Sequence, residues 1–158
     1  MKAFISGAQR QVPSIIVIIV ASGVTTVLNM SGILDSIVYY ISQLLVNFNN
    51  VFAAIGMFIA NSIINLAIPS GSGQAVAVMP IMAPLSDVLG VSRQISVLAF
   101  QLGDGFTNLL NPTNAALIGS LALAKTTFKD WVKLIFPLYI IVFFLCCIFL
   151  SIGVVIGW

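Results

Sequence analysis

Two short polar stretches interrupt an otherwise apolar sequence, and their side chains could bind a small ion and a small solute. The first is the glycine- and serine-rich run 69–74, and the second is the amide-rich run 108–114. Hydroxyl and amide oxygens are hard ligands that suit Na⁺. Pro112 also removes a helical hydrogen bond and frees the carbonyl of Asn108. The candidate binding residues are Ser70, Gly71, Ser72, Gly73, Gln74, Asn108, Asn111, Pro112, Thr113 and Asn114.

The helix that follows each polar stretch offers a second kind of binding group. Its N-terminal N–H groups and positive dipole end, expected at 74–76 and at 114–116, suit an anionic group. The alternative is that the glycines and serines only let helices pack closely in a membrane. Two such interruptions in one chain favour a binding site, because irregular backbone at membrane depth survives only where it lines a polar cavity or packs inside protein.

Asp104 is the acidic residue expected deepest in the membrane. A helix that starts at Arg93 places Asp104 about 16 Å and Asn108 about 22 Å along its axis, inside a hydrocarbon core about 30 Å thick. A carboxylate at that depth is by default a functional candidate. Asp104 could bind a cation, carry a proton or pair with a basic substrate; the alternative is a structural acid that caps a backbone break.

Asn61 and Asn65 are weaker candidates. They lie one helical turn apart in the apolar run before the first polar stretch, so both face the same side, which we expect to be the protein interior. They could contact the substrate, or they could only form hydrogen bonds to a neighbouring helix.

Other chemistries find little support in the sequence. The chain has no His, its four acidic residues are all Asp, and a net charge of +2 gives no basic surface for nucleic acid. Cys146 and Cys147 are adjacent in an apolar run and make no zinc site. We therefore expect no enzyme, no nucleic-acid partner and no cofactor beyond a coupling Na⁺ or H⁺.

A lipid bilayer is the simplest solvent that explains the composition. Hydrophobic residues make up 60% of the chain and charged residues 6%, whereas soluble domains carry about 25% charged residues. Residues 36–86 contain no charged side chain at all. The sequence therefore predicts an all-α integral membrane protein.

Breakers and charges divide the chain into five units. We expect transmembrane helices at 13–30 and 133–158, a re-entrant hairpin at 51–88 whose tip is the first polar stretch, and a transmembrane helix at 93–124 broken by the second. The apolar spacing of 33–48 is that of an amphipathic helix, and its length of about 24 Å suits the membrane interface better than a crossing.

Charge counting predicts an orientation. With three crossings, Lys2, Arg10 and the lysines at 125, 129 and 133 share one face, and Arg93 lies on the other. The positive-inside rule then places the N-terminus in the cytoplasm of a cell with an inner membrane, and the hairpin mouth and C-terminus outside.

The motifs themselves resemble a known family. Residues 65–117, NLAIPSGSGQAVAVMPIMAPLSDVLGVSRQISVLAFQLGDGFTNLLNPTNAAL, and residues 12–42 are similar to the anaerobic four-carbon dicarboxylate carriers. These DcuC-like proteins include YfcC-like members described as basic amino acid antiporters, and they belong to the ion transporter superfamily.

The resemblance implies an inverted-repeat transporter in which a substrate-bearing part slides against a scaffold. Residues 70–74 would be a hairpin tip, 111–114 the loop of a broken helix, and 33–48 an arm between the two parts. Whole members are roughly three times longer, so the chain is expected to be a C-terminal repeat: a fragment, a split-gene product, or the partner of an N-terminal half or of a second copy.

The functional expectation is a secondary transporter of a small organic anion, such as a four-carbon dicarboxylate, or of an amino acid. A basic amino acid antiporter is the first alternative. A membrane assembly protein without a substrate is the second.

Overall fold

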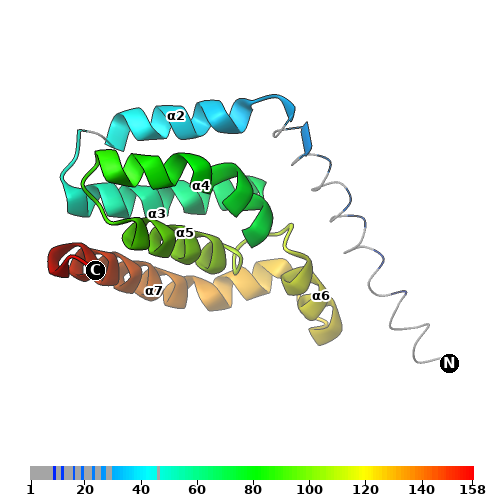
Figure 1. Cartoon of the computed structure of the whole chain (residues 1–158). Helices are drawn as coiled ribbons and strands as arrows, with labels where there is room; N and C mark the ends of the chain where they lie inside the picture. Colours follow the sequence, from blue (N-terminus) through cyan, green and yellow to red (C-terminus); the bar gives the residue numbers. More distant parts are fainter. Residues whose placement is uncertain are drawn as a thin grey trace.

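The chain folds into a bundle of helices. The computed structural model describes residues 31–45 and 47–158, together with scattered positions between Gln9 and Met30. These residues form helices and no strand, which confirms the all-α fold. The crossing expected over 13–30 falls largely outside the described residues and stays a prediction. The helices are α2 (Ile33–Leu45), α3 (Asn50–Ala67), α4 (Gly71–Val88), α5 (Arg93–Thr107), α6 (Ala115–Ala124) and α7 (Phe128–Ile156) (Figure 1).

Every helix from α3 to α7 begins after a side chain that accepts a hydrogen bond from its first turn. Such caps satisfy N–H groups that have no partner inside the helix. The capping residues are Asn49, Ser70, Ser92, Asn114 and Thr127.

The caps explain why two helices start earlier than their apolar runs. α4 begins directly after Ser70, so residues 71–74 of the expected loop form its first turn. α7 begins after Thr127 and includes the charged residues before the apolar run that the sequence places from 133. The hydrophobic pattern locates the apolar part of a helix, whereas its start is set by the cap.

The helices follow an up-and-down path. α3 and α4 are joined by residues 68–70, and α5 returns beside both. α7 packs on α3 and α5, and α6 turns away from the bundle at the end where α5 stops (Figure 1). At the opposite end, Ser92 Oγ donates a hydrogen bond to the carbonyl of Trp158, the last residue after α7.

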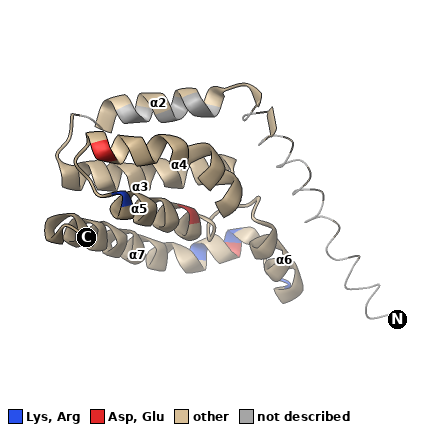
Figure 2. Ribbon diagram, in the orientation of Figure 1, with Lys and Arg blue, Asp and Glu red and all other residues tan. Residues whose placement is uncertain are grey.

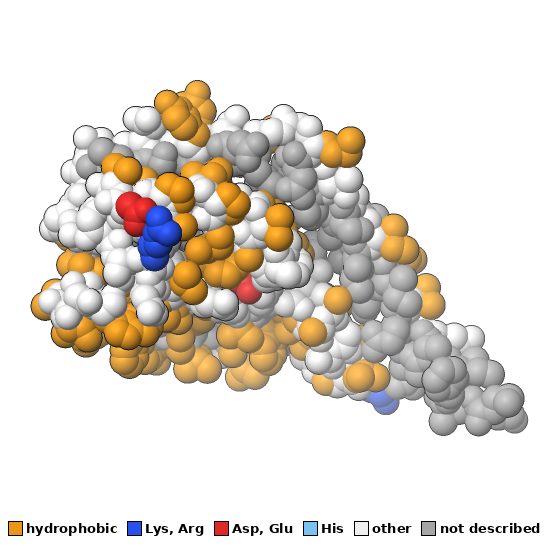
Figure 3. All heavy atoms as spheres, in the orientation of Figure 1, with side chains coloured by type: hydrophobic (Ala, Val, Ile, Leu, Met, Phe, Trp, Pro, Cys, Tyr) orange, Lys and Arg blue, Asp and Glu red, His pale blue; other side chains and the backbone are white. Residues whose placement is uncertain are grey.

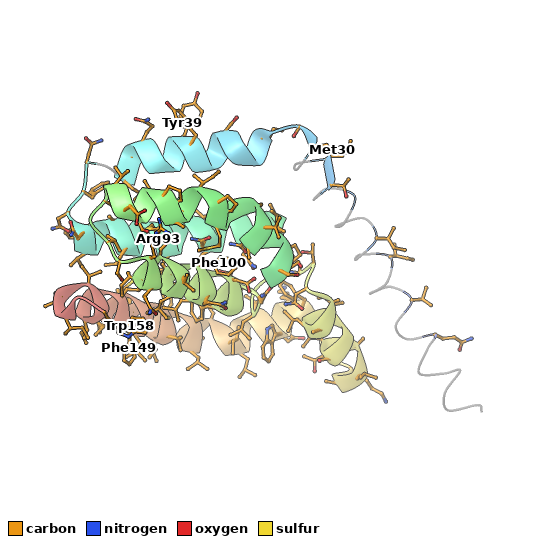
Figure 4. All side chains as sticks on the ribbon, viewed as in Figure 1. Met30, Tyr39, Arg93, Phe100, Phe149 and Trp158 are labelled. Carbon is orange, nitrogen blue, oxygen red and sulfur yellow. The ribbon has the colours of Figure 1, made fainter. Side chains whose placement is uncertain are left out.

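α2 lies against α3 and α4. Leu45 fills the notch at Gly56, where a Cβ atom would come within 2.2 Å of the leucine. Tyr39 points away from the bundle (Figure 4).

An interfacial helix lies in the plane of the membrane and crosses the direction of a spanning helix, but α2 runs along α3 in Figure 1. The interfacial placement of 33–48 therefore stays a prediction.

α3 is the central helix of the bundle. Met57, Phe58 and Ile64 on α3 are buried, and Phe58 packs its ring 5.3 Å from that of Phe143 on α7. Gly103 lets α5 approach α3 closely: a Cβ atom there would lie 2.7 Å from the Cβ of Asn61 and 3.0 Å from two backbone atoms of α3. The backbones of α3 and α5 are thus in near contact at the level of Asn61.

Among the described residues, two helices are long and apolar enough to cross a membrane, α3 and α7. α7, with 29 residues, is about 43 Å long, which matches a whole bilayer including its headgroup regions. One side of α7 exposes large apolar side chains, and hydrophobic side chains cover much of the face in Figure 3. The exposed side chains of α7 include Leu134, Phe136, Ile141, Phe144, Ile148, Phe149 and Val155.

The close approach of α3 and α5 can be tested with two neighbouring glycines. We expect Gly103→Ala to destabilise the bundle by about 1–3 kcal/mol, because its methyl group meets the backbone of α3. Gly105→Ala meets no atom within 4 Å, and alanine favours a helix over glycine by about 1 kcal/mol. Thermal unfolding in detergent, followed by circular dichroism, compares the two. Equal melting temperatures would contradict the packing.

Candidate functional site

The hairpin turn and the helix break lie at the same end of the bundle. The turn is formed by residues 68–70, and the break, residues 108–114, separates α5 from α6. Asn111 Nδ2 donates a hydrogen bond of 2.9 Å to the backbone carbonyl of Asn65, which is near the end of α3. The two polar stretches of the sequence are therefore parts of one region.

Asp104 lies against the first residue of α4. A Cβ atom at Gly71 would come within 2.8 Å of Asp104 Oδ2. The half-buried carboxylate thus sits beside the positive end of the α4 dipole. The sequence places this helix end at 74–76 and assigns it to an anionic ligand, whereas α4 begins at Gly71. A larger residue at position 71 would displace the carboxylate of Asp104 from the start of α4.

Asn65 connects Asp104 to the hairpin. Its Nδ2 donates to Asp104 Oδ1 at 2.6 Å and to Gln74 Oε1 at 3.2 Å. Gln74 Nε2 in turn donates to the carbonyl of Asn61 at 2.9 Å and to its Oδ1 at 3.3 Å. Asn61, Asn65 and Gln74 are completely buried. The three amides form a chain between the two arms of the hairpin, and the chain ends on the carboxylate.

The break is stabilised mainly by its own amides. Asn111 Oδ1 accepts from both the N–H and the hydroxyl of Thr113. Asn114 caps α6 through Oδ1 and donates from Nδ2 to the carbonyl of Asn108 at 3.4 Å. The carbonyl that Pro112 frees thus already has a donor, so it is not the open ligand that the sequence suggests.

Two buried amide oxygens in this region have no hydrogen-bond donor among the described residues: Asn65 Oδ1 and Asn108 Oδ1. The orientation of Asn65 is fixed, since its nitrogen faces two oxygens that can only accept. Asn108 donates from Nδ2 to Asp104 Oδ1 at 3.3 Å. Each orphaned oxygen therefore belongs to an amide whose other end binds the carboxylate.

No basic side chain among the described residues pairs with Asp104. The one ion pair found there joins Arg93 to Asp87 at the other end of the bundle, with a nitrogen–oxygen distance of 2.6 Å. The hydrogen bond from Arg93 lowers the pKa of the exposed Asp87. Figure 2 shows this acid–base pair where α4 leads into α5, and further charges on α6 and the start of α7.

The structure brings together only some of the candidate residues. Gly71, Gln74, Asp104, Asn108 and Asn111 meet, and Asn61 and Asn65 join them. Ser70 caps α4, Ser72 and Gly73 are exposed, and Pro112 is exposed on the break. Thr113 and Asn114 shape the loop and the start of α6.

One contact at the break was absent from the sequence prediction. Trp131 Nε1 on α7 donates a hydrogen bond of 2.8 Å to the carbonyl of Leu109. The only sequence signal is an indole in the first turn of a helix that follows the break.

Comparison with known proteins places these features in a family. Residues 1–155 match the profile of the family described as C4-dicarboxylate anaerobic carrier, DcuC. The chain is 34% identical over 136 residues to the "Putative basic amino acid antiporter YfcC" of Escherichia coli K12, covering 83% of this chain and 27% of the relative. It is 35% identical over 138 residues to an uncharacterized protein of Haemophilus influenzae Rd, covering 87% of this chain and 27% of the relative.

The chain thus spans about a quarter of the length of these relatives. No solved structure matches it.

The contact between Gly71 and Asp104 predicts a difference between two glycines of the tip. Gly71→Ala places a methyl group 2.8 Å from Asp104 Oδ2, whereas the atom nearest to the methyl group of Gly73→Ala is Ser70 Oγ, at 3.3 Å. We expect Gly71→Ala to speed amide hydrogen exchange around both residues 61–74 and residues 104–111, because its methyl group displaces the carboxylate. Gly73→Ala should affect the tip alone. An unchanged exchange pattern around Asp104 in Gly71→Ala would contradict the contact.

Proposed function

The chain belongs to the C4-dicarboxylate anaerobic carrier family, and on that premise we propose that it is part of a secondary transporter that couples solute movement to a cation. The hairpin tip, Asp104 and the helix break form its half of the binding site. The remaining half would come from the rest of a longer protein, from a separate N-terminal chain or from a second copy.

The unpaired carboxylate of Asp104 is the observation that carries this proposal. A charged group in a membrane protein is costly unless a counter-charge is near, and the described residues supply none. The orphaned oxygens of Asn65 and Asn108 lie on amides that already bind Asp104. A carboxylate and unpaired amide oxygens on neighbouring side chains are the kinds of donor that suit Na⁺, and a proton on Asp104 is the alternative coupling ion.

The position of Asp104 also bears on the substrate class. The carboxylate itself occupies the positive end of α4, so an added anion would meet a like charge until a cation neutralises Asp104. An amino acid carries an ammonium group that can face Asp104, whereas a dicarboxylate carries only groups of like charge. This arrangement favours an amino acid over a four-carbon dicarboxylate, and the name of the Escherichia coli relative points in the same direction.

The exposed apolar side of α7 supports a place in the membrane, and the proposal assigns it to the cell inner membrane. The lysines at 125, 129 and 133 would face the cytoplasm, and the pair of Asp87 and Arg93 would lie outside. The hairpin of α3 and α4 would then enter and leave on the outer side, with its turn inside the bilayer. Helix α7 would cross completely.

The test is a pair of acidic variants. We expect sodium chloride, but not choline chloride, to raise the melting temperature of the purified wild-type chain in lipid nanodiscs, because a ligand that binds only the folded state stabilises it. Asp104→Asn should lose this shift, since it removes the charge and keeps the shape. Asp87→Asn, which breaks an exposed ion pair, should retain it.

A stabilisation by falling pH instead of by Na⁺, again lost in Asp104→Asn, would assign the coupling ion as H⁺. Equal cation responses of Asp104→Asn and the wild type would refute the proposed site. Uptake of radiolabelled arginine and of succinate into proteoliposomes, with and without a cation gradient, then separates the two substrate classes. This assay uses the chain together with the remaining segments of a full-length relative.

A further inference from the structure

The break between α5 and α6 is tied to α7 by a side chain that no motif singled out. Trp131 Nε1 donates a hydrogen bond of 2.8 Å to the carbonyl of Leu109. We infer that Trp131 is a positioning residue for the proposed ion site, which it serves by fixing the backbone of the break. The inference rests on the proposed function.

Two carbonyl groups in the break need hydrogen-bond donors from outside the helix. Pro112 has no N–H and Asn114 starts a new helix, so carbonyls at the end of α5 lose their helical donors. The Asn114 amide reaches the carbonyl of Asn108 at 3.4 Å, which is a long hydrogen bond. The next carbonyl, that of Leu109, receives the shorter bond from the indole. The indole thus gives the Leu109 carbonyl a donor that the interrupted helix no longer supplies.

The indole is itself held in place by the start of α7. Thr127 Oγ1 accepts from the N–H of Asp130 at 3.2 Å and donates to its carboxylate at 2.6 Å. This capping arrangement fixes the first turn of α7, one residue before Trp131. Lys125, in the left-handed conformation with φ 54°, ends α6 shortly before Thr127. The turn from α6 to α7 is therefore short and defined, and it presents the indole to the break.

The remainder of α6 is loosely attached. Leu121 is its one buried residue. Two hollows of about 340 and 440 Å³ flank the helix, and Leu117, Ser120 and Trp131 line both. With so little packing, the hydrogen bond from Trp131 is a main constraint on where the break lies relative to α7.

The position of Leu109 matters for the site because Asn108 precedes it. Asn108 donates to Asp104 Oδ1 at 3.3 Å, and its own Oδ1 is one of the orphaned oxygens. A shift of the peptide at Leu109 would rotate this side chain away from the carboxylate. Loss of the indole N–H would thus weaken cation binding without removing a single ligand oxygen.

Two variants test the role of the N–H in the whole chain. Trp131→Phe removes it together with part of the ring, and incorporation of 3-benzothienyl-alanine at position 131 replaces the N–H by sulfur at nearly the same volume. Trp158→Phe is the matched control at the other tryptophan. We expect both changes at 131 to raise the half-saturating NaCl concentration about fivefold, the scale of one lost hydrogen bond. Trp158→Phe should leave it unchanged.

Amide hydrogen exchange without Na⁺ provides an independent measurement. Both changes at position 131 should accelerate exchange about fivefold over residues 109–118, with the start of α3 unaffected, because one hydrogen bond is lost there. A wild-type Na⁺ response in the benzothienyl variant, with unchanged exchange, would overturn the inference and leave Trp131 as an interfacial anchor. If even the wild type shows no Na⁺ response, the sodium form of the proposed function fails. In that case the exchange over 109–118 alone decides the role of Trp131.

Discussion

Asn65 on α3 joins the two polar interruptions of the bundle, because it bonds to Gln74, to Asp104 and to Asn111. Both donor positions of the Asn65 amide are used, one on the carboxylate and one on Gln74. Its backbone carbonyl accepts from Asn111 in the break. One buried residue therefore contacts α4, α5 and the loop after α5. Because its amide cannot turn without breaking a bond to an acceptor-only oxygen, its own oxygen is left without a donor.

Small residues make this connection sterically possible. Gly103 brings α5 against the backbone of α3, and Gly71 leaves room for the carboxylate of Asp104 beside the tip. Glycine inside a helix costs roughly 1 kcal/mol relative to alanine, so its use at position 103, within α5, indicates that close approach to α3 matters more there than local helix propensity. The polar network and the glycine packing are thus two aspects of one arrangement: the amides reach the carboxylate only because the backbones are so near.

Much of this arrangement could be predicted from the sequence, and the limits have physical causes. Apolar runs and breakers locate the helices, and Pro112 among asparagines marks the broken helix. The caps could have been found as well, since Ser70 and Thr127 are preferred N-cap residues. The partners of Gln74 could not, because they depend on how α4 is rotated about its axis relative to α3. The contact of Trp131 with Leu109 depends on the path of α6, which periodicity does not encode.

The chemistry of the network follows from which of its members can change charge. Asn61, Asn65, Gln74, Asn108 and Asn111 are neutral amides, which can be buried once their hydrogen bonds are made. Asp104 carries the charge of the described network.

A cation or proton that neutralises Asp104 weakens its carboxylate as an acceptor for Asn65 and for Asn108 together. The same event also reduces its attraction to the positive end of α4. Neutralisation at this one residue is therefore felt by the hairpin through Gln74 and by the break through Asn108. The proposed function would use this coupling, because the ion would then act on the hairpin and on the break at the same time.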